Sequence, residues 1–468
     1  MREVVGYLVI ALVVLAPPFG SLDRAIVAGS EPCDTVPFAL SWAIGWGQSR
    51  IDVLGAGWWD APIFHPTPGA FALSEPMPLL SLVAWPLHAI GVPLATCVTT
   101  LVLACMVANA AMMRRLLLRL RVGPALATVG GAIALLLPFV HQELGVLPLV
   151  AVWPLVWMMT ALLDLFDGRR SLRRAAIELG LAIGLGFACC GQLTLFGVLA
   201  LLPASLCLVQ RRHLRPSFAG ALALATAIGS AIVLPLALPQ RATLAALDLH
   251  RSDRSQSRGA IKPMQLVRVP WPGLVPLPRS WVARDVEARA LDPGPLRVLA
   301  AISGAALGLQ RRRRRREIAM LLAVVLAALA LASGPRLGPL ADALELVPGY
   351  GQIRALFRAT ALAQIGVIAL AMIGLRMLQV RLRRRRGLVV LFAALLLVEL
   401  VPPSPRWTTL PDPELAWVQW LRDEAEPGAA IAWIPFAPSG DVCDHEGTAR
   451  AMLLGLAHGH PLVNGYSS

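Results

Sequence analysis

Lysine is nearly absent from this 468-residue chain: Lys262 is the only one, against 41 arginines. Charged residues of all kinds are scarce at 15%, while 57% of residues are hydrophobic and the mean hydropathy is +0.66. A soluble domain is roughly a quarter charged and half apolar. These deficits exclude a soluble enzyme, a coiled coil and a disordered tail. What remains is an all-α membrane protein with many spans, whose arginines are expected to mark its topology.

Sequence motifs for nucleotide and metal chemistry are also missing. The chain has no Walker loop, GxGxxG turn, zinc-ligand spacing or nucleophile elbow. It contains no cytosolic nucleotide-binding domain, so the donor in any transfer reaction should be carried by a lipid. A divalent metal has no clear ligand set here, and the cofactor is left open.

Long apolar runs provide the spans, because a crossing needs roughly 17–25 mostly apolar residues. We predict about eleven transmembrane helices: Val4–Leu22, Leu94–Met113, Val122–Val140, Leu144–Leu163, Ala175–Gly191, Leu193–Val209, Phe218–Leu238, Pro295–Leu309, Ile318–Ser333, Ala355–Leu378 and Gly387–Val401. The first could be a signal peptide, but it lacks a convincing small-x-small cleavage site, so we expect a retained signal anchor.

The distribution of charge tests this arrangement independently. With the N-terminus inside, the inner loops hold 23 arginines and a net charge of +19, whereas the outer segments sum to −4. Every dense arginine run then lies on one side, as the positive-inside rule requires. A nucleic-acid or anionic-lipid patch is the weaker interpretation of these runs. We therefore predict a multi-pass protein of a bacterial inner membrane, with a cytoplasmic N-terminus, an extracytoplasmic C-terminus and no nucleic-acid partner.

Several segments fall outside the spans. Residues 1–403 form the predicted transmembrane domain, with extracytoplasmic loops over 23–93 and 240–294. Within the first loop, Met77–Ile90 is apolar but contains two prolines, so we expect an interfacial or re-entrant helix. Residues 404–468 resemble the start of an α/β domain that is cut short, with helices at Pro413–Ala425 and Gly447–Gly459 around a strand at Ala429–Phe436.

The seven cysteines follow no metal-ligand spacing. Five of them lie in predicted spans, where they are expected to pack as small hydrophobic side chains. Cys33 and Cys443 lie outside the spans. They form either a disulfide, as an oxidising compartment allows, or two free thiols.

Chemistry at the outer surface would need acids and a cation that binds phosphate. The first outer loop supplies six acids: Asp23, Glu31, Asp34, Asp52, Asp60 and Glu75. A short outer turn adds His141 and Glu143. Arg354 and Arg358 are four residues apart at the start of a predicted span, so they are expected to share one helix face and to favour an anion there. Two snorkelling arginines are the alternative.

Four stretches resemble the multi-spanning GT-C glycosyltransferases, in particular the bacterial mannosyltransferase-like and lipopolysaccharide-core or O-antigen group. They occur in the family's order and cover much of the chain: EPCDTVPFALSWAIGW (31–46), WWDAPIFHPTPGAFALSEPMPLLSLVAWPL (58–87), LVPGYGQIRALFRATAL (346–362) and GHPLVNGYSS (459–468). The Asp-Glu pair of protein mannosyltransferases is missing, because Thr35 follows Asp34.

The resemblance implies a membrane-embedded transferase with an extracytoplasmic active site. A polyprenyl-phosphate-type lipid would carry the sugar donor, and a cell-envelope glycan or lipid would be the acceptor. By position, Asp34 would be the base, with Asp60 and Glu143 as further acids. Arg354 and Arg358 would bind the donor phosphate. His141 and His65 are weaker candidates for donor or acceptor contacts.

Two other functions fit the sequence. A catalytically inactive relative could act as a scaffold in envelope assembly, in which case the acids and arginines need not converge. A transporter or flippase is less well supported, because no matched pair of broken helices marks two halves of the chain.

Overall fold

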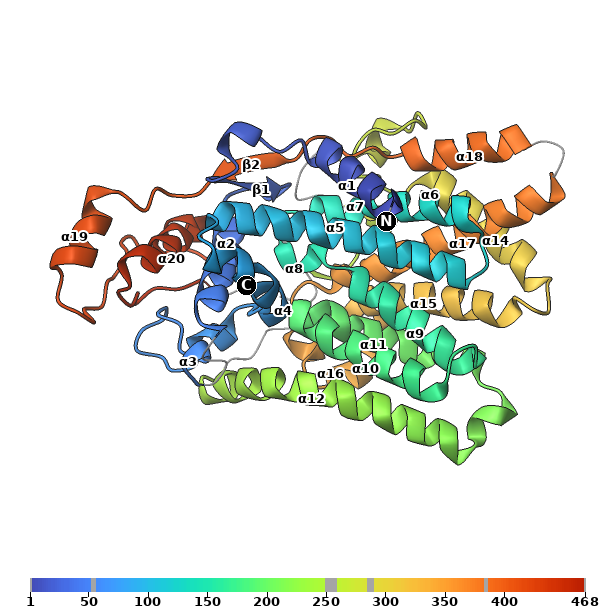
Figure 1. The fold of residues 1–468 in the computed structure, drawn as a ribbon, viewed down its shortest axis with the longest axis horizontal. Coiled ribbons are helices and arrows are strands. Elements are labelled where there is room, and N and C mark those ends of the chain that lie inside the picture. The colour runs from blue at the N-terminus through green and yellow to red at the C-terminus, as the bar shows by residue number, and fades with distance from the viewer. Residues whose placement is uncertain (1, 52–55, 249–258, 284–289, 383–385, 467–468) are drawn as a thin grey trace.

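The chain folds into a bundle of helices with one small sheet. The structure, a computed structural model, describes residues 2–51, 56–248, 259–283, 290–382 and 386–466 (Figure 1). Within these described ranges, seven helical segments are long and apolar enough to cross a membrane: Leu94–Arg119, Pro124–Gln142, Leu147–Asp167, Gly191–Leu208, Pro216–Ala246, Arg315–Leu337 and Leu356–Arg381. This confirms a helical protein built for a membrane, whereas the predicted count of eleven spans is not established.

The four other predicted spans also fall on helices. Three of these are shorter than 18 residues, namely α1 (Arg2–Leu15), α14 (Pro295–Leu309) and α18 (Arg386–Val398). The fourth, α10 (Leu172–Cys189), carries three charged residues. The predicted interfacial segment is α4 (Pro78–Ala89), which is apolar and short.

Two of the membrane segments are interrupted near one end. The first consists of α6 (Pro124–Leu135) and α7 (Pro138–Gln142), and the second of α8 (Leu147–Val150) and α9 (Trp153–Asp167). A third break, at Cys190, is the turn between two predicted spans, α10 and α11 (Gly191–Ser205).

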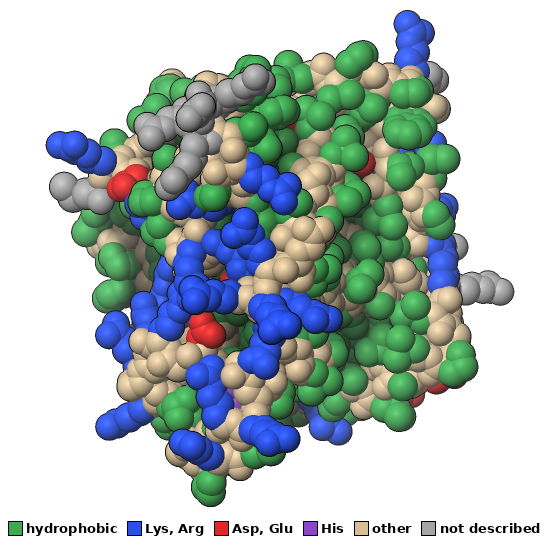
Figure 2. Space-filling view, turned by 90° about the vertical axis from the view of Figure 1, so that its right-hand side faces the viewer, with side chains coloured by type: hydrophobic (Ala, Val, Ile, Leu, Met, Phe, Trp, Pro, Cys, Tyr) green, Lys and Arg blue, Asp and Glu red, His purple; other side chains and the backbone are tan. Residues whose placement is uncertain are grey.

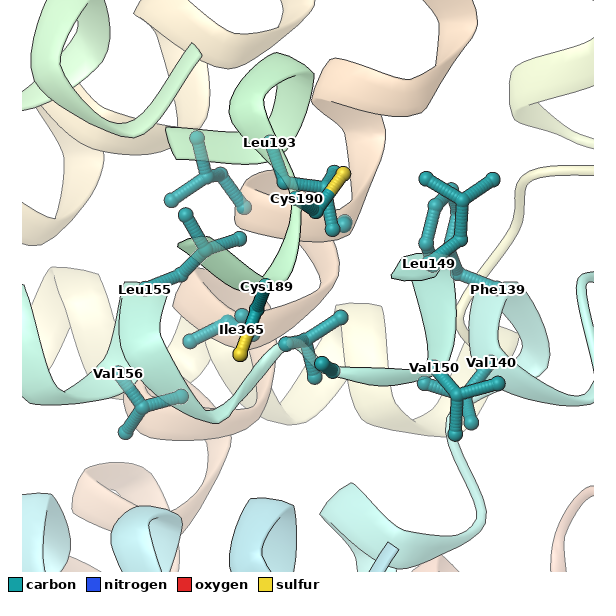
Figure 3. Close-up of a cluster of buried hydrophobic side chains, with 14 of the residues drawn as sticks. Phe139, Val140, Leu149, Val150, Leu155, Val156, Cys189, Cys190, Leu193 and Ile365 are labelled. Carbon is teal, nitrogen blue, oxygen red and sulfur yellow. The ribbon is translucent and has the colours of Figure 1, made fainter. Parts of the chain in front are cut away.

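These breaks lie inside the protein. Leu137, Ala151 and Cys190 are all buried, and Figure 3 shows the two cysteines at the α10–α11 junction amid apolar side chains from α7, α8 and α9. Irregular backbone is tolerated at membrane depth only where protein or a watery cavity surrounds it. Burial therefore allows the chain to place helix ends in the middle of the bundle.

Close glycine contacts join α14 to α17 (Thr360–Arg381). A Cβ atom on Gly304 would collide with the carbonyl oxygen of Leu370, and one on Gly374 would lie 2.7 Å from the carbonyl oxygen of Ala300. Small residues let membrane helices approach this closely, and van der Waals packing then supplies the association energy.

A buried ion pair fixes the start of α14. The Glu399 carboxylate, which follows α18, accepts hydrogen bonds from the backbone N–H groups of Leu296 and Arg297, and it lies 3.7 Å from the Arg297 guanidinium. Both side chains are 1% exposed. Since isolated buried charges are costly, the carboxylate acts as a helix cap and as a counter-ion.

Arginines gather at one end of the bundle, where Figure 2 shows a dense field of basic side chains. Their loops contact one another directly: Arg119 pairs with Asp167 and Glu317, Arg212 donates to the carbonyl oxygen of Phe166, and Arg314 donates to that of Arg121. The arginine runs that the sequence placed on one side of the membrane therefore share one end of the structure.

The segment after residue 404 lies at the other end, against the first predicted loop (Figure 1). Strand β2 (Arg406–Thr409) pairs antiparallel with β1 (Ala25–Gly29), and α20 (Glu446–His458) packs on α2 (Thr35–Ser49). Both helices predicted in the tail are present, the first as α19 (Ala416–Glu424). The predicted strand at Ala429–Phe436 is reduced to a bridge between Ile431 and Leu462, because only that short stretch finds a partner.

We expect Gly304→Ala to destabilise the protein by about 1–3 kcal/mol, because the added methyl group overpacks the α14–α17 contact. The matched control is Gly220→Ala in α12 (Pro216–Ala246), where a Cβ atom meets nothing within 4 Å. That change should be neutral or stabilise by up to about 1 kcal/mol through helix propensity. Thermal unfolding in detergent measures both, and equal behaviour would refute the close packing.

Candidate active site

Glu75 and Arg358 come together from sequence positions 283 residues apart. Glu75 is half-buried and immediately precedes α4, while Arg358 lies in the short 3₁₀ turn η10 (Leu356–Ala359) that leads into α17. Burial raises the pKa of the Glu75 carboxyl, and the nearby Arg358 guanidinium lowers it only in part. Among the described residues, no donor bonds directly to this carboxylate.

The N-terminus of α11 completes this cluster. Arg358 donates a hydrogen bond from Nη1 to Oε1 of Gln192, at 2.5 Å, and its buried Nε has no hydrogen-bond partner in the described part of the chain. Cys190, the residue before α11, lies within electrostatic range of both Glu75 and Arg358. The first N–H groups of a helix lack intrahelical acceptors and favour anions. A guanidinium with an unused donor beside such a helix end suits a phosphate oxygen.

The two candidate arginines do not share a helix face, so that prediction is wrong. Arg354 lies in an exposed bend, η10 begins only at Leu356, and α17 begins at Thr360. Gly259 packs so closely on the carbonyl oxygen of Arg354 that a Cβ atom would collide with it, and this contact accompanies the bend. Of the pair, Arg358 points into the protein and Arg354 is left at the surface.

Asp34 occupies a clamp between the first loop and the tail. Its Oδ1 accepts from Arg406 at 2.6 Å and its Oδ2 from Thr408 at 2.5 Å. Its backbone N–H donates to Glu446 at 3.2 Å. Both carboxylate oxygens are therefore engaged by β2, and the residue holds β2 against the start of α2.

A disulfide between Cys33 and Cys443 stands beside this clamp. The sequence left free thiols as an alternative, and the structure selects the disulfide. It closes a loop across a sequence separation of 410 residues. Covalent and ionic links thus attach the tail to the first loop at the same point.

The turn that carries His141 and Glu143 does lie under the first loop. Ser30 donates to the carbonyl oxygen of Gln142 at 2.6 Å, and a Cβ atom on Gly145 would lie 2.8 Å from Cγ of Glu31. Glu143 is 6% exposed, and among the described residues its carboxylate has no hydrogen-bond partner. His141 is buried, with Nε2 3.2 Å from the carbonyl oxygen of Leu135.

Other predicted site residues lie at the surface. Asp60 is exposed and accepts from the backbone of Gly69 at 2.7 Å. His65 is exposed, and its backbone N–H donates to the carbonyl oxygen of Leu462. Asp52 lies outside the described residues. Among the described residues, no hydrogen bond or ion pair joins Asp60 or His65 to Arg358, so both lie on the loop outside this cluster.

The described residues contain no group of three or more His, Cys, Asp or Glu side chains that could hold a metal ion. The structure therefore identifies no ligand set for a cofactor among the described residues.

Solved structures share this fold. No family model matches the chain, and no curated protein is similar to it in sequence. The arabinofuranosyltransferase AftD from Mycobacteria, solved by cryo-EM, matches 100% of this chain with a TM-score of 0.55 at 16% identity. A structure of a mutant of AftD matches with a TM-score of 0.51 at 17% identity.

The chain spans about a third of the length of AftD, at 31% and 33% of the two solved chains. The likeness shows that this chain shares a fold with part of AftD, which agrees with the membrane-transferase fold that the sequence resemblance implied. The finer mannosyltransferase-like and lipopolysaccharide-core group is not established.

We expect Cys33 and Cys443 to resist alkylation in the folded, unreduced protein and to be labelled only after reduction. Mass spectrometry of the alkylated peptides measures this. Half-exposed Cys207 should instead be labelled once the protein is unfolded, with or without reductant. Labelling of both Cys33 and Cys443 before reduction would contradict the disulfide.

Proposed function

We propose that the chain is a membrane glycosyltransferase that takes a sugar from a polyprenyl-phosphate-type lipid donor and transfers it to a cell-envelope acceptor. In this proposal, Arg358 and the N-terminus of α11 bind the donor phosphate, and Glu75 is the general base. The observation that carries it is that Glu75 lies within electrostatic range of Arg358, whose guanidinium bonds to Gln192 at the N-terminus of α11, in a chain that shares the fold of AftD.

The reaction would invert the anomeric centre. The acceptor hydroxyl oxygen attacks the anomeric carbon as the bond from that carbon to the phosphate oxygen breaks. The phosphate leaves with the bonding electrons, and Glu75 takes the hydroxyl proton. Positive charge on Arg358 and the helix end stabilises the charge that develops on the leaving group. A raised pKa suits the base, because proton transfer is most efficient when the pKa of the base approaches the working pH.

The orientation of the chain belongs to the same proposal. The arginine-rich end would face the cytoplasm and the end with the tail would face outward, in a bacterial inner membrane. The segregation of arginines supports this arrangement. The disulfide at the opposite end supports it independently, since disulfides persist in oxidising compartments.

The other predicted acids take different places in this proposal. Asp34 would be a positioning residue that holds the tail on the first loop, since Arg406 and Thr408 occupy its oxygens. Glu143, buried beneath that loop without a hydrogen-bond partner among the described residues, is the second candidate for a catalytic acid. Asp60, His65, His141 and Arg354 would contribute at most to donor or acceptor contacts.

A scaffold without catalysis is the second candidate function, and the Asp34 clamp favours it. If Asp34 were the residue on which transfer depends, an acceptor hydroxyl would have to share a carboxylate oxygen with Arg406 or Thr408. The two functions differ in whether any change at Glu75 alters envelope glycans.

Glu75→Gln should lower sugar transfer by about 10²–10⁴-fold, because the amide cannot accept the proton. The variant is expressed in cells that lack the native gene, and envelope glycans are analysed by mass spectrometry. Glu424→Gln, on the exposed face of α19, is the matched control and should transfer normally.

Asp34→Asn refines this test. It keeps the Thr408 contact and should reduce transfer far less than Glu75→Gln. Full transfer by Glu75→Gln at normal membrane abundance would refute the proposed base. If sugar transfer were lost completely in Asp34→Asn and kept in Glu75→Gln, Asp34 would be the general base.

The pH dependence of transfer should follow the Glu75–Arg358 pair. A base works only when deprotonated, so activity falls as the pH drops through its pKa, and burial moves that loss to a higher pH than for an ordinary glutamate. Arg358 lowers the Glu75 pKa, so Arg358→Gln should move the acid limb to still higher pH and lower turnover by about 10²–10³-fold. If Arg358→Gln lost activity at the same acidic pH as the native chain, Arg358 would not be acting on the pKa of Glu75.

A further inference from the structure

A cavity of about 430 Å³ lies at the arginine-rich end, away from the candidate active site. Five arginines line it, from the end of α5 (Leu94–Arg119) and the α9–α10 loop, with Asp164 as the acid in its wall. The arginines are Arg114, Arg115, Arg119, Arg169 and Arg170. A space of this size holds a small ligand or a headgroup.

Acids lie beneath the arginines. The Asp164 side chain is 4% exposed and that of Glu178 is 15% exposed, whereas Arg115, Arg169 and Arg170 are 31–36% exposed. Glu178 is shared by Arg115, Arg170 and Arg174, and Asp164 by Arg119 and Arg170. Arg114 also pairs with Glu3, and Arg119 with Asp167 and Glu317. These acids hold the guanidinium groups in position, and of them only Asp164 lines the cavity beside the five arginines.

One arginine in the wall is almost fully buried. The Arg119 side chain is 7% exposed and bonds to Asp164, Asp167 and the carbonyl oxygen of Leu163. Its Nη1 has no hydrogen-bond partner among the described residues and lies 3.7 Å from the Glu317 carboxylate. A fixed charge of this kind makes the site pre-organised. Several guanidinium forks around one space match the three or more oxygens of a phosphate better than the two of a carboxylate.

Apolar surface adjoins the same cavity. Ala111 and Leu118 of α5 also line it, and Leu118 is 36% exposed although it is apolar. The ligand would therefore meet cations and, next to them, the side of a membrane-spanning helix. A lipid has this combination, with its phosphate at the helix ends and its acyl chains along the helices.

We propose that this cavity binds the phosphate of an anionic phospholipid from the leaflet at the arginine-rich end. In the orientation proposed above, this is the cytoplasmic leaflet. The site lies apart from Glu75 and Arg358, and it does not depend on whether the protein transfers sugar. It would secure the ends of α5, α9 and α10 and give the protein a preference for anionic membranes.

Native mass spectrometry of the full chain in detergent tests the site, with phosphatidylglycerol, phosphatidylcholine or inorganic phosphate added. We expect phosphatidylglycerol to bind at one site and in clear preference to phosphatidylcholine. The variant R115Q/R169Q removes two cations while Glu178 and Asp167 keep other arginine partners. Its affinity should fall about fivefold for each arginine.

The control R211Q/R312Q removes two exposed arginines from the same end that do not line the cavity. It should keep the affinity of the native chain, and thermal unfolding should show that both double variants are folded. Equal binding of the two lipids, or equal loss in both variants, would overturn the proposal. Displacement of phosphatidylglycerol by inorganic phosphate at similar concentration would also overturn it, in favour of a free phosphate ligand.

Discussion

A backbone inside a membrane must satisfy its own hydrogen bonds, and the architecture of this protein follows from how it meets that demand. The chain interrupts two of its membrane segments, at Leu137 and Ala151, turns between two others at Cys190, and buries each of these breaks among apolar side chains. The break at Cys190 has the largest consequence. It ends α10 and starts α11 within the bundle, so that the N-terminal turn of α11 meets Arg358. Packing of the core thereby places a helix end and a guanidinium where an anion could be held.

Charge is divided between the two ends for different purposes. At the arginine-rich end, cations outnumber acids and some acids pair with more than one guanidinium, as Glu178 does with Arg115, Arg170 and Arg174. At the other end, Asp34 and Arg406 form a single pair beside a disulfide. The arginine-rich end therefore keeps positive charge that a ligand can meet. At the other end, the Asp34–Arg406 pair attaches the tail to the first loop. Net charge alone would not distinguish these two arrangements.

Helix positions and the segregation of arginines could be predicted from the sequence, because apolar runs and basic loops are local signals. The site could be predicted only in part. Arg358 was identifiable as a charge at the edge of a span, but Glu75 was one of six acids in the same loop. Its selection depends on a contact across 283 residues and on burial, neither of which has a local signature. Strand β1 was missed for the same reason, since Ile26 and Val27 become a strand only when Trp407 and Thr408 arrive beside them.

The contrast between Asp34 and Glu75 explains why an acid's position in a motif does not settle its role. A general base must offer an oxygen to the hydroxyl that it deprotonates. Asp34 sits where the GT-C resemblance places the base, but Arg406 and Thr408 take both of its oxygens, and opening them would release β2. Among the described residues, the carboxylate oxygens of Glu75 accept no hydrogen bond. Burial raises the pKa of Glu75, and nearby Arg358 lowers it only in part. The carboxylate with fewer partners is the one that can act as a base without loosening the fold.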